Sequence, residues 1–107
     1  ILAGESFTQK EDEYLVFFYD MKDSKSTEYA DLVSKYRDKD KHLTIYTVDL
    51  GEGLNKRYIT EDDENSSALK ASELRIKGAT LIHFKEKKID EYITSSFGDY
   101  LDVNIEK

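Results

Sequence analysis

The chain has 107 residues, of which 38% are hydrophobic and 12% aromatic, a composition that suits one folded domain over residues 1–107 and argues against disorder. Its 16 Lys and Arg and 23 Asp and Glu give a formal net charge of −7, so phosphate backbones repel it and we expect no nucleic-acid partner. No apolar run approaches the ~20 residues that span a bilayer, so we expect no membrane insertion within this segment.

The chain contains no cysteine and no proline. Without a thiol it cannot carry out dithiol–disulfide exchange. It shows no signal peptide and does not begin with Met, so it reads as a mature fragment. The lack of cysteine fits more than one cellular compartment.

Two strands and a helix are expected in the first half. Residues 14–19 form a near-continuous apolar run, which predicts a strand buried on both faces of a sheet. Apolar residues at helical spacing predict a helix over residues 27–37, with Ser26 or Thr27 as its N-cap. Residues 43–50 are rich in β-branched side chains and predict a second strand.

The middle of the chain is less regular. Residues 51–65 contain a hint of a short helix at residues 54–59, followed by an acidic loop at residues 61–65. We expect another short helix over residues 66–74, capped by one of the two serines at its start. Gly78 then breaks this helix.

The last third predicts a β-hairpin and a helix. Residues 80–84 and 89–94 are its expected strands, with the turn at residues 86–88. Ser95 or Ser96 then caps a last helix, whose apolar face would consist of Phe97, Tyr100, Leu101 and Ile105. The expected order is βαβ, helix, β-hairpin, helix, in which the first two strands pair in parallel and the hairpin adds an antiparallel edge.

Particular segments carry a family resemblance. Val16-Phe17-Phe18-Tyr19 resembles the first core strand of thioredoxin domains, which leads into their active-site loop. Ile76-Lys77-Gly78-Ala79-Thr80-Leu81-Ile82-His83-Phe84 is similar to the family's Val-x-Gly-x-Pro-Thr-Leu-x-x-Phe segment, with one residue fewer. Residues 85–88 would be its hairpin turn, and Ser6-Phe7 matches a Ser-Phe pair common near the family's N-terminus. The resemblance implies an α/β, thioredoxin-like fold with a central mixed sheet of about four strands flanked by helices.

The chain departs from this family where the family's chemistry lies. The loop that corresponds to Cys-X-X-Cys consists here of Asp23, Ser24, Lys25 and Ser26. Ala79 takes the place of the family's cis-proline. A cis peptide bond before a residue other than proline costs ~3 kcal/mol, so we expect the Gly78–Ala79 bond to be trans. The resemblance therefore implies a redox-inactive interaction or accessory domain and not an enzyme. Such a domain needs no cofactor and binds a protein partner.

Groups beside that loop are the candidate contacts for such a partner, since Tyr is over-represented at interfaces. The predicted binding face consists of Tyr19, Met21, Tyr29, Gly78 and Thr80. The composition resembles that of cell-envelope thioredoxin-like proteins of Gram-positive bacteria, which implies an extracytoplasmic location, with the cytoplasm as the alternative.

Other classes of function stay open. The acidic loop at residues 61–65 would serve an ion- or ligand-binding protein, but it lacks the ligand spacing of an EF-hand and we predict no specific metal site. The chain could also be a structural module of a larger envelope assembly. A serine hydrolase would need a histidine beside Ser26. We expect His42 to be solvent-exposed and His83 to be partly buried in a strand with one hydrogen bond.

Overall fold

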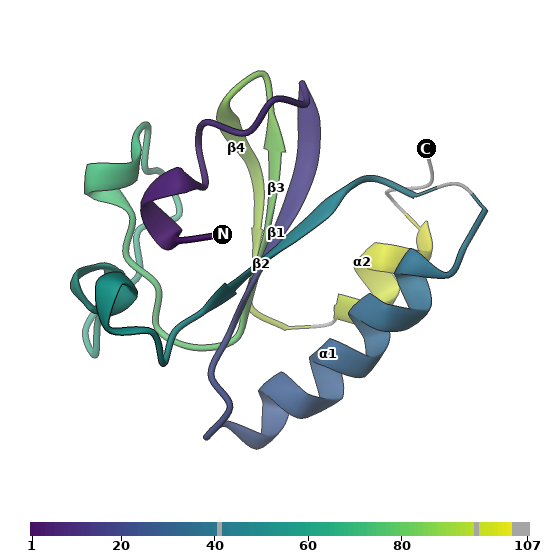
Figure 1. Ribbon diagram of the computed structural model, residues 1–107, viewed down its shortest axis with the longest axis horizontal. Helices are drawn as coiled ribbons and strands as arrows, with labels where there is room; N and C mark the ends of the chain where they lie inside the picture. Colours follow the sequence, from purple (N-terminus) through teal and green to yellow (C-terminus); the bar gives the residue numbers. More distant parts are fainter. Residues whose placement is uncertain (41, 96, 104–107) are drawn as a thin grey trace.

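The structure, a computed structural model, describes residues 1–40, 42–95 and 97–103. In this part of the chain the sheet consists of β1 (Glu13–Tyr19), β2 (Ile45–Asp49), β3 (Thr80–Lys85) and β4 (Lys88–Ile93). The α-helices are α1 (Ser24–Arg37) and α2 (Phe97–Val103), and the 3₁₀ helices are η1 (Ala3–Glu5), η2 (Gly53–Tyr58) and η3 (Ala71–Glu73) (Figure 1). The predicted α/β class with a mixed four-stranded sheet is confirmed.

The strand order is β2-β1-β3-β4, so β1 and β3 are central. β1 pairs with β2 in parallel, with Phe17 opposite Thr47, and with β3 antiparallel, with Phe17 opposite Leu81. β3 and β4 form the expected antiparallel hairpin. The central strands are buried along most of their length, as the apolar runs predicted.

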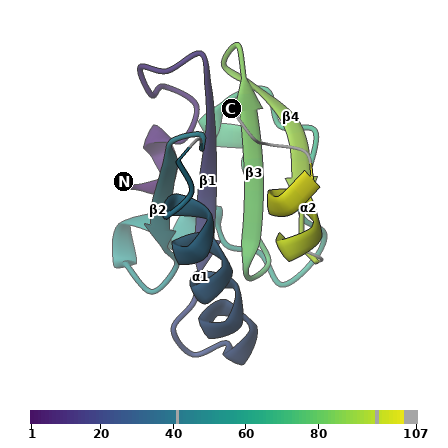
Figure 2. The same ribbon diagram turned by 90° about the vertical axis from the view of Figure 1, so that its right-hand side faces the viewer.

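Different elements pack on the two faces of the sheet. Both α-helices lie on one face, and the 3₁₀ helices with their connecting loops lie on the other (Figures 1 and 2). Alternation along β1 sends Leu15 and Phe17 to the helical face, where Phe97 and Leu101 of α2 join them. Tyr14, Val16 and Phe18 enter the opposite core, together with residues that include Ala3, Phe7, Tyr58, Leu74 and Ile76.

Helix α1 begins three residues earlier than predicted. Its N-cap is Asp23, whose carboxylate accepts a hydrogen bond of 2.9 Å from the Lys25 backbone N–H. The prediction that Ser26 or Thr27 caps the helix is therefore wrong. Ser26 lies inside the first turn, where its side chain accepts a bond from the Asp20 backbone N–H.

The short helix predicted over residues 66–74 is replaced by turns and by η3. The physical reason is competition from polar side chains for backbone N–H groups. Asn65 accepts from the Ser67 N–H at 3.1 Å, and Glu73 accepts from the Leu69 N–H at 2.9 Å. Leu69, an apolar position of the expected helix, is 74% exposed. The short helix predicted at residues 54–59 forms as η2.

The β3–β4 hairpin turns at two residues with left-handed backbone, Glu86 (φ 55°) and Lys87 (φ 66°), so the turn is shorter than predicted. After β4, α2 begins at Phe97, and both Phe97 and Leu101 are buried as predicted. Two positions of this prediction, Ser96 and Ile105, lie outside the described residues.

Strand β2 forms one edge of the sheet, and its outward carbonyl groups accept bonds from outside the sheet. The Arg37 guanidinium donates to the Ile45 carbonyl, and the Asn55 side-chain amide donates to the Asp49 carbonyl at 2.8 Å. The backbone nitrogen of Ile1 lies 2.9 Å from the Thr47 carbonyl oxygen. These donors satisfy acceptors that an added strand would otherwise use.

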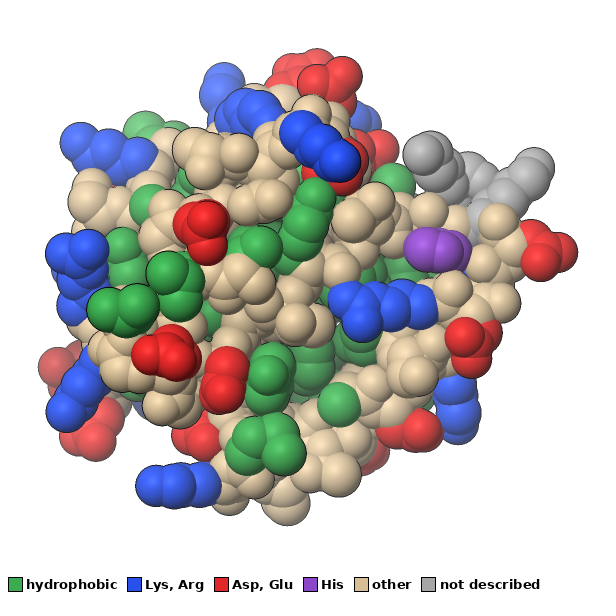
Figure 3. Space-filling view, in the orientation of Figure 1, with side chains coloured by type: hydrophobic (Ala, Val, Ile, Leu, Met, Phe, Trp, Pro, Cys, Tyr) green, Lys and Arg blue, Asp and Glu red, His purple; other side chains and the backbone are tan. Residues whose placement is uncertain are grey.

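Acidic and basic side chains are interspersed over the face shown in Figure 3, and hydrophobic side chains surface between them in its lower middle. In the described part of the chain, no helix has the length and apolar character needed to cross a membrane.

Candidate functional site

The N-terminus of α1 and the loop before β3 meet around an open groove of about 240 Å³. An ideal Cβ atom placed on Gly78 would lie 3.7 Å from the Asp23 carboxylate oxygen Oδ2. The described residues that line this groove are Asp23, Lys25, Glu64, Lys77, Gly78, Ala79, Thr80 and Thr94. We call it the Asp23 groove. It joins the two segments that the sequence resemblance singled out, although they are far apart in the chain.

Two of the four side chains in loop 23–26 make hydrogen bonds that explain why these residues occur there. Asp23 is the half-buried cap of α1. Ser26 is 2% exposed and holds the Asp20 backbone N–H at 2.9 Å. Ser24 and Lys25 are exposed to solvent. Helix capping and loop formation account for Asp23 and Ser26.

The loop that precedes β3 is held by its own side chains. The Thr80 hydroxyl donates to the Gly78 carbonyl at 2.9 Å, and Thr80 itself is fully buried. Among the described residues there is no cis peptide bond, so the Gly78–Ala79 bond is trans, as predicted. Ala79 is 9% exposed, and the Lys77 side chain before it is exposed.

The five residues of the predicted binding face lie in three settings. Gly78 and Thr80 line the Asp23 groove. Tyr19 and Met21 line a second groove, between α1 and the sheet, and Met21 is 75% exposed. Tyr29 lies in a third setting: its half-buried ring stacks on Phe97 of α2, with ring centroids 3.9 Å apart.

The acidic loop contributes one residue to the Asp23 groove. Residues 61–64 are exposed, and of these Glu64 lines the groove. Asn65 fixes the end of the loop, because its backbone N–H donates to the Arg75 carbonyl and its side-chain amide donates to the Glu73 carbonyl. Within the described ranges, no three His, Cys, Asp or Glu side chains converge as metal ligands.

The groove carries two charges of each sign, from Lys25 and Lys77 and from Asp23 and Glu64. Tyr92 of β4 lies near Glu64, and its hydroxyl donates to the Arg75 carbonyl at 2.9 Å. Burial raises the pKa of Tyr92, and the negative charge of Glu64 raises it further, so Tyr92 is a neutral phenol. Sequence reasoning gave the acidic loop that contains Glu64 as a candidate ion- or ligand-binding segment. It missed Lys77 and Thr94, because their approach to Asp23 depends on the tertiary fold.

Both described histidines have partners away from Ser26. His83 is 5% exposed, with Nε2 2.6 Å from Glu13 Oε2 and Nδ1 2.6 Å from the Tyr100 hydroxyl, so the single hydrogen bond predicted for it is wrong. Because a carboxylate only accepts, Nε2 donates to Glu13. His42, predicted to be exposed, is half-buried, with Nδ1 2.9 Å from the Leu43 carbonyl oxygen.

Comparison with models of known protein families, with curated proteins and with solved structures finds no match for this chain.

Proposed function

We propose that this chain is a redox-inactive, thioredoxin-like domain that binds an extended polypeptide segment in the Asp23 groove. The order of elements supports the proposal: β1, α1 and β2 form a βαβ unit with parallel strands, and a hairpin and a helix follow. The sequence resemblance to thioredoxin domains implies this order with one more helix before the hairpin, where this chain has turns and η3.

One observation carries the proposal. Asp23, in the place of the family's first cysteine, lies beside Gly78, just before the place of the family's cis-proline. In that family, these two segments together receive a substrate peptide. Here they flank an open groove.

The residues of the groove favour binding over reaction. The chain offers no thiol, Asp23 is engaged in capping α1, and Ser26 is buried under its own loop. Lysine and carboxylate side chains around the rim suit a polar segment that carries both signs of charge. We therefore infer that the groove recognises a partner and leaves it chemically unchanged.

Peptides selected from a display library against the folded chain, followed by amide shift mapping in NMR, would test this proposal. We expect shifts concentrated at residues 23–25 and 77–80. The double variant Lys25→Glu, Lys77→Glu should bind the selected peptides with an affinity that is lower by about tenfold or more, since it reverses two charges at the rim.

The matched control is Lys70→Glu, Lys88→Glu, which makes the same charge change at exposed residues that do not line the groove. It should leave the affinity nearly unchanged. Equal losses in the two double variants, or shifts that map to another face of the molecule, would contradict the proposal.

A further inference from the structure

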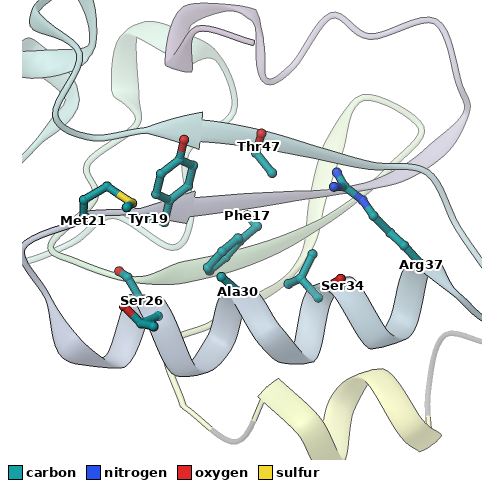
Figure 4. A pocket seen from close by; sticks show the side chains of 10 residues that line it. Phe17, Tyr19, Met21, Ser26, Ala30, Ser34, Arg37 and Thr47 are labelled. Atoms are coloured by element: carbon teal, nitrogen blue, oxygen red, sulfur yellow. The ribbon is translucent and has the colours of Figure 1, made fainter.

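A second groove, of about 300 Å³, runs between α1 and the β1–β2 side of the sheet (Figure 4). Its described lining residues are Phe17, Tyr19, Met21, Ser26, Thr27, Ala30, Val33, Ser34, Arg37 and Thr47. Phe17 and Val33 are almost fully buried, so they form its floor. We call it the Arg37 groove. Its volume lies at the lower end of the range of small-molecule sites, about 300–1,000 Å³.

The charge of this groove differs from that of the chain as a whole. The chain has 23 Asp and Glu, yet the described lining residues include neither type, and Arg37 carries their one charge. Arg37 lies at the C-terminal end of α1, and Met21 lies at the opposite end of the groove (Figure 4). The groove is therefore uncharged along its length, with Phe17 and Val33 as its apolar floor, and cationic at one end.

Arg37 keeps hydrogen-bonding capacity for a ligand. A guanidinium has five N–H donors in a planar fork that matches a carboxylate. In the described structure, one nitrogen atom of the Arg37 guanidinium donates to the Ile45 carbonyl. Ser34, one turn earlier on α1, places a hydroxyl group on the same wall.

The groove is better suited to an alkyl chain than to an added strand. A peptide strand would need free backbone acceptors on β2, and the carbonyl groups of Ile45, Thr47 and Asp49 already have donors. An alkyl chain needs no hydrogen bonds and gains from burial against Phe17 and Val33. From Thr27 to Arg37, the helical wall is about 15 Å long at 1.5 Å per residue.

We propose that the Arg37 groove binds a medium-chain fatty acid, with the carboxylate on the Arg37 guanidinium and the alkyl chain directed along α1 towards Met21. The anionic group then pairs with the cationic end, and the apolar tail covers the rest. None of the residues that make these contacts lines the Asp23 groove, so the proposal stands apart from the peptide-binding function.

Titration of the folded chain with sodium decanoate, below its micelle-forming concentration, would test this proposal by amide shifts in NMR. We expect saturable shifts at the residues that line the Arg37 groove. Decanol, which has the same tail without the charge, should bind about tenfold more weakly, because it forgoes a charge-assisted bond. Equal binding of the two probes, or decanoate shifts outside this groove, would overturn the proposal.

Substitutions of Arg37 and of a control arginine complete the test. Arg37→Gln should abolish the preference for decanoate over decanol, and Arg37→Lys should restore most of it. Arg57→Gln makes the same charge change at an exposed residue of η2 and should leave the preference intact.

Because Arg37→Gln also removes a bond to β2, a second substitution keeps the test independent of that bond. Ala30→Leu adds bulk to the groove from an exposed helix position and should weaken decanoate and decanol alike. Urea denaturation would show that each variant remains folded. Unchanged decanoate affinity in a folded Ala30→Leu variant would contradict the placement of the alkyl chain along α1.

Discussion

Tyr46 and Glu11 form a paired phenol and carboxylate on the face of the sheet opposite the α-helices. The Tyr46 hydroxyl lies 2.6 Å from Glu11 Oε1 and 2.9 Å from Oε2. This bond is the main reason why the pKa of Glu11 is lowered from 4.5, and it raises the pKa of Tyr46 to about 12. Its contribution to stability is thus present above pH 4.5 and is lost as the pH falls through the lowered pKa of Glu11.

We expect Tyr46→Phe to return the pKa of Glu11 towards 4.5, because the phenol would no longer stabilise the carboxylate. Carboxyl titration by NMR measures this change directly. Tyr92→Phe, which removes a hydroxyl bonded to the Arg75 carbonyl, is the control and should leave the pKa of Glu11 unchanged. An unmoved Glu11 pKa in Tyr46→Phe would refute the role of the bond.

Single residues also show where sequence reasoning was sufficient. Asp and Ser are common at the start of helices, so a cap near residues 23–27 could be predicted. The choice of Asp23 could not, because Ser26 has equal capping ability in sequence. The fold decides between them by placing Ser26 under the Asp20 backbone N–H.

At the scale of elements, α2 is held by aromatic contacts. Phe97 is fully buried, with its ring stacked on Tyr29 and edge-on to Phe17 at a centroid distance of 5.9 Å. The hydroxyl of Tyr100, one turn later, lies 2.6 Å from Nδ1 of His83 in β3. Burial raises the pKa of Tyr100, and the nearby carboxylates of Glu91, Asp90 and Glu13 raise it further, so this phenol keeps its proton at neutral pH.

We expect Phe97→Ala to destabilise the protein by about 3–5 kcal/mol, since it empties a packed aromatic site. Amide hydrogen exchange should rise first in α2, which has few other anchors in the described structure. Leu54→Ala, at a residue that is 68% exposed, is the control and should change stability by less than about 0.5 kcal/mol. Similar losses in both variants would contradict this account of α2.

Elements with strong hydrophobic patterns could be predicted, and those without them could not. All four strands, α1 and α2 follow from apolar runs or helical spacing. The segment 66–74 has only weak periodicity, and there Asn65 and Glu73 take the backbone N–H groups that a helix would use. The number of apolar residues in a segment does not by itself show whether the segment forms a helix or a series of turns.

At the scale of the molecule, both grooves depend on contacts between distant segments. The Asp23 groove brings residues of α1 to the loop before β3 and to Glu64 of the acidic loop. Sequence resemblance identified the first two segments but gave no reason to add the third. The Arg37 groove had a partial signal, since Ala30, Ser34 and Arg37 share one helical face. Its other wall, from β1 and β2, emerges only in the folded sheet.

The hairpin turn of β3 and β4 links parts of the molecule that are far apart in sequence. Lys87 Nζ donates to the carbonyl groups of Gln9 and Glu11, and the Glu86 backbone N–H donates to the Asp12 carbonyl at 2.8 Å. The turn and the segment that enters β1 therefore support each other. Both turn residues keep a left-handed backbone, which non-glycine residues adopt at some cost.

A consequence concerns proteolysis. An exposed turn with several lysines would ordinarily be an early target for trypsin, which needs an unfolded stretch of chain in its active site. Because three hydrogen bonds anchor this turn, we expect limited digestion to cut first after Lys70, in the irregular exposed stretch before η3. Mass spectrometry of early fragments would decide, and prior cleavage after Lys87 or Lys88 would count against the anchoring. The most basic turn of the sheet would then be among the last places where a protease opens the chain.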